Sequence, residues 1–300
     1  MSQALESGST ISGPWRLTVW EKKNSPTCYV FSEEHDNEGS CPEQKDIAVL
    51  AKDILRNTRH VHVFIEHFSH ALGIKRVVYS EEQACSAKSE SILNNMRNCL
   101  EVLRINRPEE KNRIHFVDPR MDIVGVLPDG KLYEAITHYT KFLMRSGNLS
   151  EALMTVYEAF IHPLLSIVPN KFGVHGRMTG VMERYESQMT EVQQSLFLRL
   201  WKVDIVERIK TLSETYVLME KTQSLSRLTN LKLSYTDMVN KFMDMCLLAQ
   251  FFVAQNKGMS AAVIYAGSLH SLNFETYLGN YGYTRTRMFE NKSLTACIVL

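Results

Sequence analysis

The 300-residue sequence lacks several features that would place it in a specialised class of protein. Basic residues barely outnumber acidic ones, 34 to 33, so there is no charge excess of the kind that binds nucleic acid or an anionic membrane surface. The longest apolar stretch, Cys246 to Ala254, is interrupted by Gln250 and is far shorter than the roughly 18 residues that a membrane-spanning helix needs. We therefore expect no nucleic-acid partner and no stable insertion into a membrane.

The six cysteines are scattered along the chain and include no Cys-x-x-Cys pair. In a chain of this length, such spacing is typical of reduced thiols rather than of a disulfide framework. Residues 1–14 have no basic segment followed by an apolar one, so they do not resemble a signal peptide, and we interpret them as a flexible tail. Together these features predict an intracellular, cytoplasmic protein.

The last four residues, Cys297 to Leu300, match the sequence pattern for prenylation. No polybasic segment precedes them, and anchoring by a single lipid normally needs a second signal. An apolar strand over residues 294–300 explains the same pattern. We expect Cys297 to lie in that strand without modification.

The sequence has the composition of a globular protein, with 44% hydrophobic and 22% charged residues. Short apolar runs typical of strands alternate with segments that carry apolar residues at helical spacing. Strands are predicted at residues 17–20, 27–31, 62–65, 113–117, 260–266 and 294–300, with a further edge at 77–78. Helices are predicted at about residues 42–57, 86–104, 131–167 and 272–278, and a helical stretch of three helices at residues 183–257. The alternation predicts one α/β domain over residues 15–300, with a mainly parallel central sheet flanked by helices and a helical insertion at about residues 131–257.

Four of the predicted strands end in polar residues. These ends contain Glu34 and His35, Glu66 and His67, Asp118 and Arg120, and Gly267 and His270. A polar residue after a single strand usually begins a loop or caps a helix. In open α/β sheets, however, ligands bind beyond the carboxyl ends of the strands. If the four strands are parallel neighbours, His35, Glu66, Asp118 and His270 should meet at one edge of the sheet.

Three of these segments resemble the motifs of a known group of proteins. Val30 to Asn37 (VFSEEHDN) resembles the Gly-Glu-x-His-Asp-Asn motif of the haem-uptake (ChaN-like) branch of the Tiki and erythromycin-esterase superfamily. Phe64 to Phe68 (FIEHF) is similar to its second motif, and Ile264 to His270 (IYAGSLH) to its late Gly-x-x-His. The match covers only these short segments, and Ser32 stands where the first motif has glycine. Uncharacterised proteins of large DNA viruses have a similar layout, with an Asp-x-Arg sequence like that of Asp118 to Arg120.

The resemblance implies that His35, Glu66 and His270 hold a divalent metal ion or activate water. Two imidazoles and one carboxylate can bind zinc, manganese or cobalt and leave a position open for water, whose pKa the metal lowers. Without a metal, Glu66 would orient or deprotonate a histidine, which would then accept a proton from water as a general base. Asp118 and Arg120 are candidates for substrate binding, because Arg120 could hold an oxyanion or a carboxylate.

Other residues near these strand ends are further candidates for the site. Glu34, His67 and Gly267 lie within the matched segments, and Tyr265 and Tyr283 could stack on or ligate a haem. The leading hypothesis is a hydrolase of a small-molecule or peptide substrate. One alternative is a catalytically silent structural or interaction protein, a homo-oligomer or a virion component, that keeps the fold. The other is a module that binds haem or another small ligand without turnover.

Overall fold

The computed structural model describes residues 10–33, 45–68, 80–86, 92–119, 174–222, 225–291 and 297–299. Contacts divide the chain into two units, one formed by residues 1–118 with 247–300 and the other by residues 119–246. The predicted helix at residues 131–167 and the predicted edge at 77–78 lie outside the described residues. The described residues of the predicted site, Glu66, His67, Asp118, Gly267 and His270, belong to the first unit.

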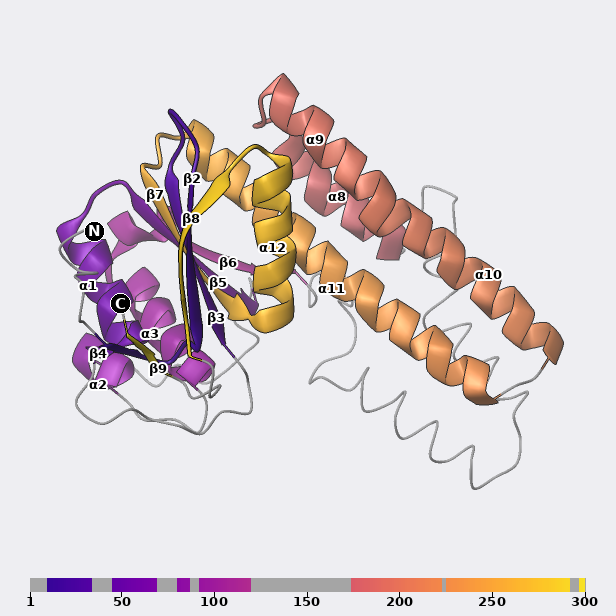
Figure 1. Ribbon diagram of the computed structural model, residues 1–300, viewed down its shortest axis with the longest axis horizontal. Helices are drawn as coiled ribbons and strands as arrows, with labels where there is room; N and C mark the ends of the chain where they lie inside the picture. The colour runs from indigo at the N-terminus through magenta and orange to yellow at the C-terminus, as the bar shows by residue number, and fades with distance from the viewer. Residues whose placement is uncertain are drawn as a thin grey trace. The chain divides into compact units, whose positions relative to one another are not determined.

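The main sheet of the first unit has six strands (Figure 1). In spatial order they are β6 (Ile114–Asp118), β5 (Val61–Phe68), β7 (Ala261–Gly267), β3 (Thr27–Glu33), β2 (Arg16–Glu21) and β8 (Thr284–Glu290). The first four are parallel neighbours, whereas β2 runs antiparallel to both β3 and β8. The prediction of an α/β fold with a mainly parallel sheet is confirmed.

The central strands were predictable because both of their faces are buried. Every residue of β7 is buried, and its sequence, AAVIYAG, is the near-continuous apolar run that such strands require. The edge strand β8 was not predicted, because its sequence, TRTRMFE, contains no apolar run or regular apolar alternation and most of its residues are exposed.

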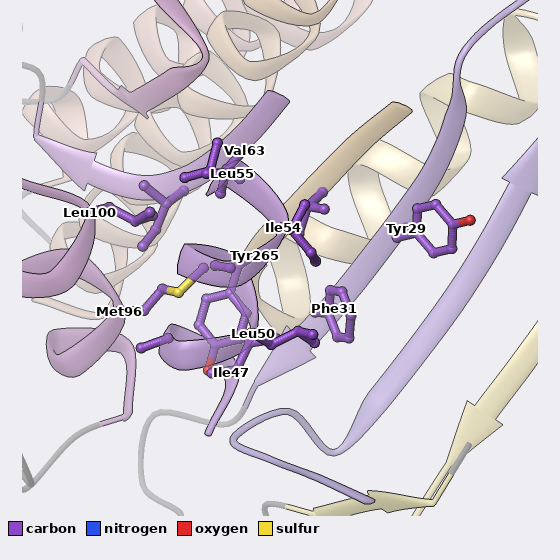
Figure 2. Packing of buried hydrophobic residues seen from close by; sticks show 14 of the residues in the cluster. Tyr29, Phe31, Ile47, Leu50, Ile54, Leu55, Val63, Met96, Leu100 and Tyr265 are labelled. Atoms are coloured by element: carbon purple, nitrogen blue, oxygen red, sulfur yellow. The ribbon is translucent and has the colours of Figure 1, made fainter. Parts of the chain in front are cut away.

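One face of the main sheet packs against α1 (Ile47–Asn57), α2 (Glu81–Ser86) and α3 (Ile92–Asn106). Figure 2 shows Phe31 and Tyr265 of the sheet beside Leu50 of α1 and Met96 of α3, all of them buried. The apolar stripe of α1 faces this cluster, and the helix begins where the side chain of Asp46 accepts a hydrogen bond from the amide of Ala48. Full burial of each large apolar side chain stabilises the fold by about 1.5–3 kcal/mol.

The other face of the sheet contacts α12 (Ser268–Asn280), which lies against β3 and β7 (Figure 1). This helix is longer than the predicted one and begins immediately after β7. Phe251, near the end of α11 (Leu225–Asn256), packs against Phe64 of β5 and Phe274 of α12. A 3₁₀ turn, η2 (Pro108–Asn112), leads into β6.

A second, three-stranded sheet pairs β1 (Thr10–Ser12) with both β4 (Lys45–Asp46) and β9 (Cys297–Val299). Residues 10–12 were predicted to belong to a flexible tail, but their pairing with two distant segments gives them a regular strand. Cys297 begins β9, as expected for an ordered carboxyl-terminal strand.

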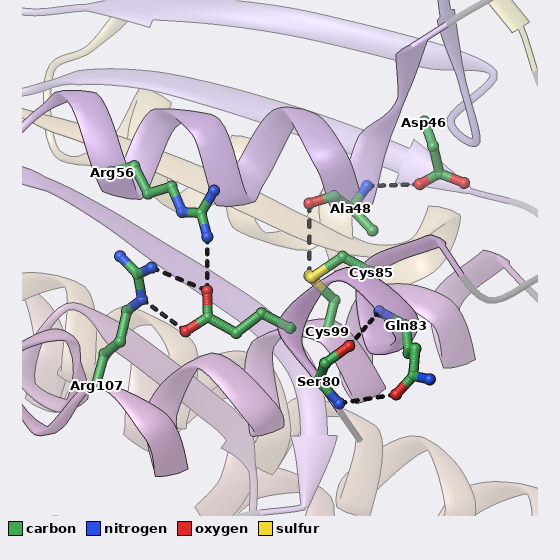
Figure 3. Close-up of a disulfide and its surroundings, with 9 residues drawn as sticks. Asp46, Ala48, Arg56, Ser80, Gln83, Cys85, Cys99 and Arg107 are labelled. Atoms are coloured by element: carbon green, nitrogen blue, oxygen red, sulfur yellow. Dashed lines mark hydrogen bonds and ion pairs between the residues drawn. A yellow bond between two sulfur atoms is a disulfide. The ribbon is translucent and has the colours of Figure 1, made fainter.

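A disulfide joins Cys85 of α2 to Cys99 of α3 (Figure 3). The prediction that all cysteines are reduced thiols is therefore wrong for this pair. The two cysteines are 14 residues apart, and only the packing of α2 against α3 brings their Cα atoms to 4.4 Å. Within the described ranges, Cys28 and Cys246 are buried cysteines that do not belong to this disulfide. Because disulfides persist mainly in oxidising compartments, the cysteine pattern no longer supports the predicted cytoplasmic location.

The second unit contains helices over most of its described length. They are α8 (Val174–Glu186), α9 (Glu191–Trp201), a π-helical turn (Lys202–Val206), α10 (Glu207–Thr222) and the first part of α11. Thr190 and Gln193 form a capping box at the start of α9, and the ring of Trp201 contacts those of Phe197 and Phe242. Among the described helices, none combines the length and apolar character needed to cross a membrane.

Candidate functional site

The carboxyl ends of β6, β5, β7 and β3 lie side by side, because these strands are consecutive parallel neighbours. This is the arrangement that the predicted site requires. Glu66 follows Ile65 in β5, at the point where the pairing of β5 with β6 shifts by one residue. Such a bulge changes the direction of the side chains that follow it.

Glu66 and His270 form the central contact at this edge of the sheet. One carboxylate oxygen of Glu66, Oε1, lies 3.9 Å from Nε2 of His270. The other, Oε2, accepts a hydrogen bond of 3.1 Å from the backbone amide of Gly267. Both side chains are almost fully buried, since Glu66 is 3% exposed and His270 is 6% exposed. The structure thus brings together two of the three residues predicted for the centre of the site, with Gly267 beside them.

The first turn of α12 is fixed to the ends of β3 and β7, and this places His270. The hydroxyl of Ser268 donates to the carbonyl of Glu33 at 2.9 Å and accepts from the indole of Trp15 at 3.1 Å. The hydroxyl of Ser271 lies 3.0 Å from the carbonyl oxygen of Ala266. His270 therefore stands on a helix turn that is held at two points of the sheet.

His67 follows Glu66 in β5 and contacts residues of β6 and α3. The ring of His67 packs edge-on against Phe116, and its Nε2 lies 3.7 Å from a carboxylate oxygen of Glu101. The pKa of His67 is lowered to about 4, first by burial and then by the charge of Arg97, while the carboxylate of Asp118 opposes the shift. His67 is therefore neutral at physiological pH. Asp118 is buried at the end of β6 and acts electrostatically on His67.

Tyr265 and Tyr283 are core residues. Tyr265 is fully buried, and its hydroxyl donates a hydrogen bond of 2.5 Å to Glu33 Oε2. Burial, followed by the charge of Glu33, raises the pKa of Tyr265 well above its ordinary value. Tyr283 is buried against Phe251. The interpretation of these tyrosines as haem ligands is therefore not supported by their surroundings.

The remaining predicted residues, Glu34, His35 and Arg120, lie outside the described part of the chain. Across the described ranges, no three His, Cys, Asp or Glu side chains are grouped so that they could hold a metal ion. Glu66 and His270 would contribute two of the three predicted metal ligands, and His35 would have to supply the third.

A buried polar network on the α12 face of the sheet was not predicted. Nη2 of Arg16 in β2 donates to Glu275 Oε2 in α12 at 2.7 Å, and the hydroxyl of Thr18 donates to Glu275 Oε1 at the same distance. Arg16 and Glu275 are each 5% exposed. Arg16 lies just before the strand predicted at residues 17–20, and the sequence gives no indication of its partner, 259 residues away.

A second unpredicted feature is a pair of histidines in the interior of the sheet. Nδ1 of His62 in β5 lies 2.9 Å from Nε2 of His115 in β6, and the ring of His115 stacks on that of Phe64. Burial lowers the pKa of His62 to about 4 and that of His115 to about 3. Both imidazoles are therefore neutral near pH 7, so the ring that donates the shared proton and the ring that accepts it are both uncharged.

Comparisons of the chain with protein-family models, with curated protein sequences and with solved structures found no match.

Proposed function

We propose that the protein is a hydrolase that activates water at Glu66 and His270. The observation that supports this proposal most directly is the position of the Glu66 carboxylate, between the amide of Gly267 and Nε2 of His270. The proposal also accommodates the resemblance to the Tiki and erythromycin-esterase superfamily, whose second and late motifs correspond to the segments that contain these two residues. The substrate would be a small molecule or peptide with an ester or amide bond.

The chemistry assigned to the pair is that of a base and the carboxylate that orients it. Glu66 would hold the imidazole of His270 in one orientation and stabilise its protonated form. His270 would accept a proton from water as the water attacks the carbonyl carbon of the substrate. The amide of Gly267 keeps the Glu66 carboxylate in place, and it lies at the amino end of α12, where the helix dipole favours a negative charge.

The prediction for activity is that Glu66→Gln and His270→Ala each lower the rate of hydrolysis by about 10²- to 10⁴-fold, the usual contribution of general acid–base catalysis. The measurement is turnover of a panel of ester, amide and peptide substrates. His60→Ala is the matched control, because His60 is an exposed histidine just before β5, and it should retain wild-type rates. A wild-type protein that turns over nothing in the panel would contradict the proposal.

A bound divalent ion, of manganese, cobalt or zinc, is a second element of the proposal, with His35, Glu66 and His270 as its ligands. Such an ion would lower the pKa of a bound water. Elemental analysis of the purified protein should then find about one ion per chain, and His270→Ala should lose it, since structural and catalytic sites rarely survive loss of one of three protein ligands. Retention of the ion by Glu66→Gln would assign Glu66 to orienting a ligand rather than to binding the metal.

The extent of burial favours one alternative function, a catalytically silent protein in which the same pair joins α12 to the sheet. Glu66 and His270 are both more than nine-tenths buried. Under this alternative, His270→Ala would lower the free energy of unfolding by about 1–3 kcal/mol, because it removes a partner from a buried carboxylate. Under the hydrolase proposal, the variant should in addition lose turnover, so the presence of wild-type turnover is the measurement that separates the two functions.

A further inference from the structure

The backbone at Glu66 departs from regular pairing and is held from outside the sheet. Between Ile65 and Phe68, β5 advances three residues while β6 advances two, from Phe116 to Asp118. The extra residue makes this a bulge, and bulges commonly direct a side chain at a functional site. The carbonyl oxygen of Glu66 accepts a hydrogen bond of 2.6 Å from Nε of Arg97, a residue of α3.

The position of Arg97 depends on α3, and α3 is fastened to α2 near both ends of that shorter helix. Cys99, two residues after Arg97, forms the disulfide with Cys85 at the carboxyl end of α2. At the other end of α2, the carboxylate of Glu81 forms ion pairs of 2.7 Å with Arg107, just beyond α3, and with Arg56 of α1 (Figure 3).

We propose that Arg97 is a positioning residue for Glu66, and that the Cys85–Cys99 disulfide makes this positioning depend on the redox state. A dithiol reductant would break the sulfur–sulfur bond by thiol–disulfide exchange. Two cysteine thiols would form, taking up two electrons and two protons, while the dithiol closes to its own disulfide. The packing of α2 against α3 and the ion pair between Glu81 and Arg107 would then remain. That ion pair has partly exposed members and contributes far less than a covalent bond.

The consequence for turnover rests on the proposed hydrolase function, but the positioning itself can be measured without a substrate. The amide of Gly267 donates to the Glu66 carboxylate, so its hydrogen-exchange rate reports whether that side chain is in place. Ile264, in the interior of β7, supplies an internal reference, because its backbone belongs to the sheet ladder.

The experiment is amide exchange of the full chain measured by NMR. In Arg97→Met, and in wild-type protein treated with dithiothreitol, we expect exchange at Gly267 to accelerate by up to about tenfold, the value of one hydrogen bond. Exchange at Ile264 should stay unchanged. Arg97→Lys should restore part of the protection, because its ammonium can still donate to the carbonyl. Glu66→Ala gives the rate for complete loss of the carboxylate.

Controls separate this mechanism from a general destabilisation of the sheet and from effects of dithiothreitol on other cysteines. The double variant Cys85→Ala/Cys99→Ala should show the accelerated rate at Gly267 and no further response to dithiothreitol. An unchanged rate at Gly267 in Arg97→Met, or an equal acceleration at Ile264, would overturn the positioning role. An unchanged rate in the reduced wild type would overturn the redox dependence. Neither result bears on hydrolysis, which the substrate panel tests separately.

Discussion

Replacing Glu275 with alanine should lower the free energy of unfolding by about 3–5 kcal/mol, the usual cost of removing one partner from a buried ion pair. Glu275 accepts hydrogen bonds from both Arg16 and Thr18, and its removal leaves the guanidinium of Arg16 buried without its carboxylate. Within the described residues, Nη1 of Arg16 has no hydrogen-bond partner, so it offers no alternative contact. Chemical denaturation of the wild type and the variant measures the difference.

Two further variants identify the cause of that loss. Glu290→Ala removes an exposed carboxylate at the end of β8 and should change stability by no more than about 0.5 kcal/mol. The double variant Arg16→Met/Glu275→Leu replaces the ion pair by apolar groups of similar size, and it should recover most of the stability lost in Glu275→Ala. If the double variant is as unstable as the single one, loss of packing rather than an unpaired charge is the cause.

The sequence contains enough information to predict the central sheet. The strands β3, β5, β6 and β7 were located because each contains a short run of apolar residues, as buried parallel strands do, and because polar residues follow each run. The sequence led us to expect that these four strands are parallel neighbours, but it did not predict their order in the sheet. The edge strand β8 was not found, because an exposed edge imposes little pattern on its residues.

The candidate site was predictable to the extent that it depends on where strands end. Glu66 and His270 lie 204 positions apart in the sequence and meet because β5 and β7 are adjacent and α12 begins directly after β7. The bulge in β5 and the contact from Arg97 could not be predicted, since a register shift leaves no local signature in the sequence. The same holds for Cys85 and Cys99, whose pairing depends on how α2 packs against α3.

The contact between His62 and His115 could not be predicted either, because each histidine occupies a strand position that suits either a buried or an exposed side chain. Their contact depends on the alignment of β5 with β6, in which Phe64 lies beside His115. Their burial has a consequence for stability that the sequence alone did not indicate. Each ring is neutral in the folded protein under conditions in which the same ring in an unfolded chain would begin to bind a proton.

Acidification should therefore destabilise the fold through the pair formed by His62 and His115. In the folded protein, burial lowers the pKa of His62 from the ordinary 6.5 to about 4. Between these values the unfolded chain binds a proton that the folded chain does not, so the free energy of unfolding is highest above pH 6.5 and falls as the pH is lowered toward 4. For His62 alone the loss across this window is about 3 kcal/mol, and protonation of His115 would add repulsion between two adjacent imidazolium rings.

The measurement is urea denaturation at intervals from pH 7.5 to pH 4, comparing the wild type with the double variant His62→Gln/His115→Gln. Carboxylates contribute to the pH dependence of both proteins, so the informative quantity is the difference between the two curves. That difference should be nearly constant above about pH 6.5 and should shift in favour of the variant by more than about 3 kcal/mol by pH 4, because His115 adds to the contribution of His62 in the same direction. His60→Gln, the exposed neighbour, should stay close to the wild-type curve, because burial is the first cause of the lowered pKa of His62 and the charge of His60 is a lesser one. A constant difference over the whole range would show that the buried pair does not exclude protons from the folded state.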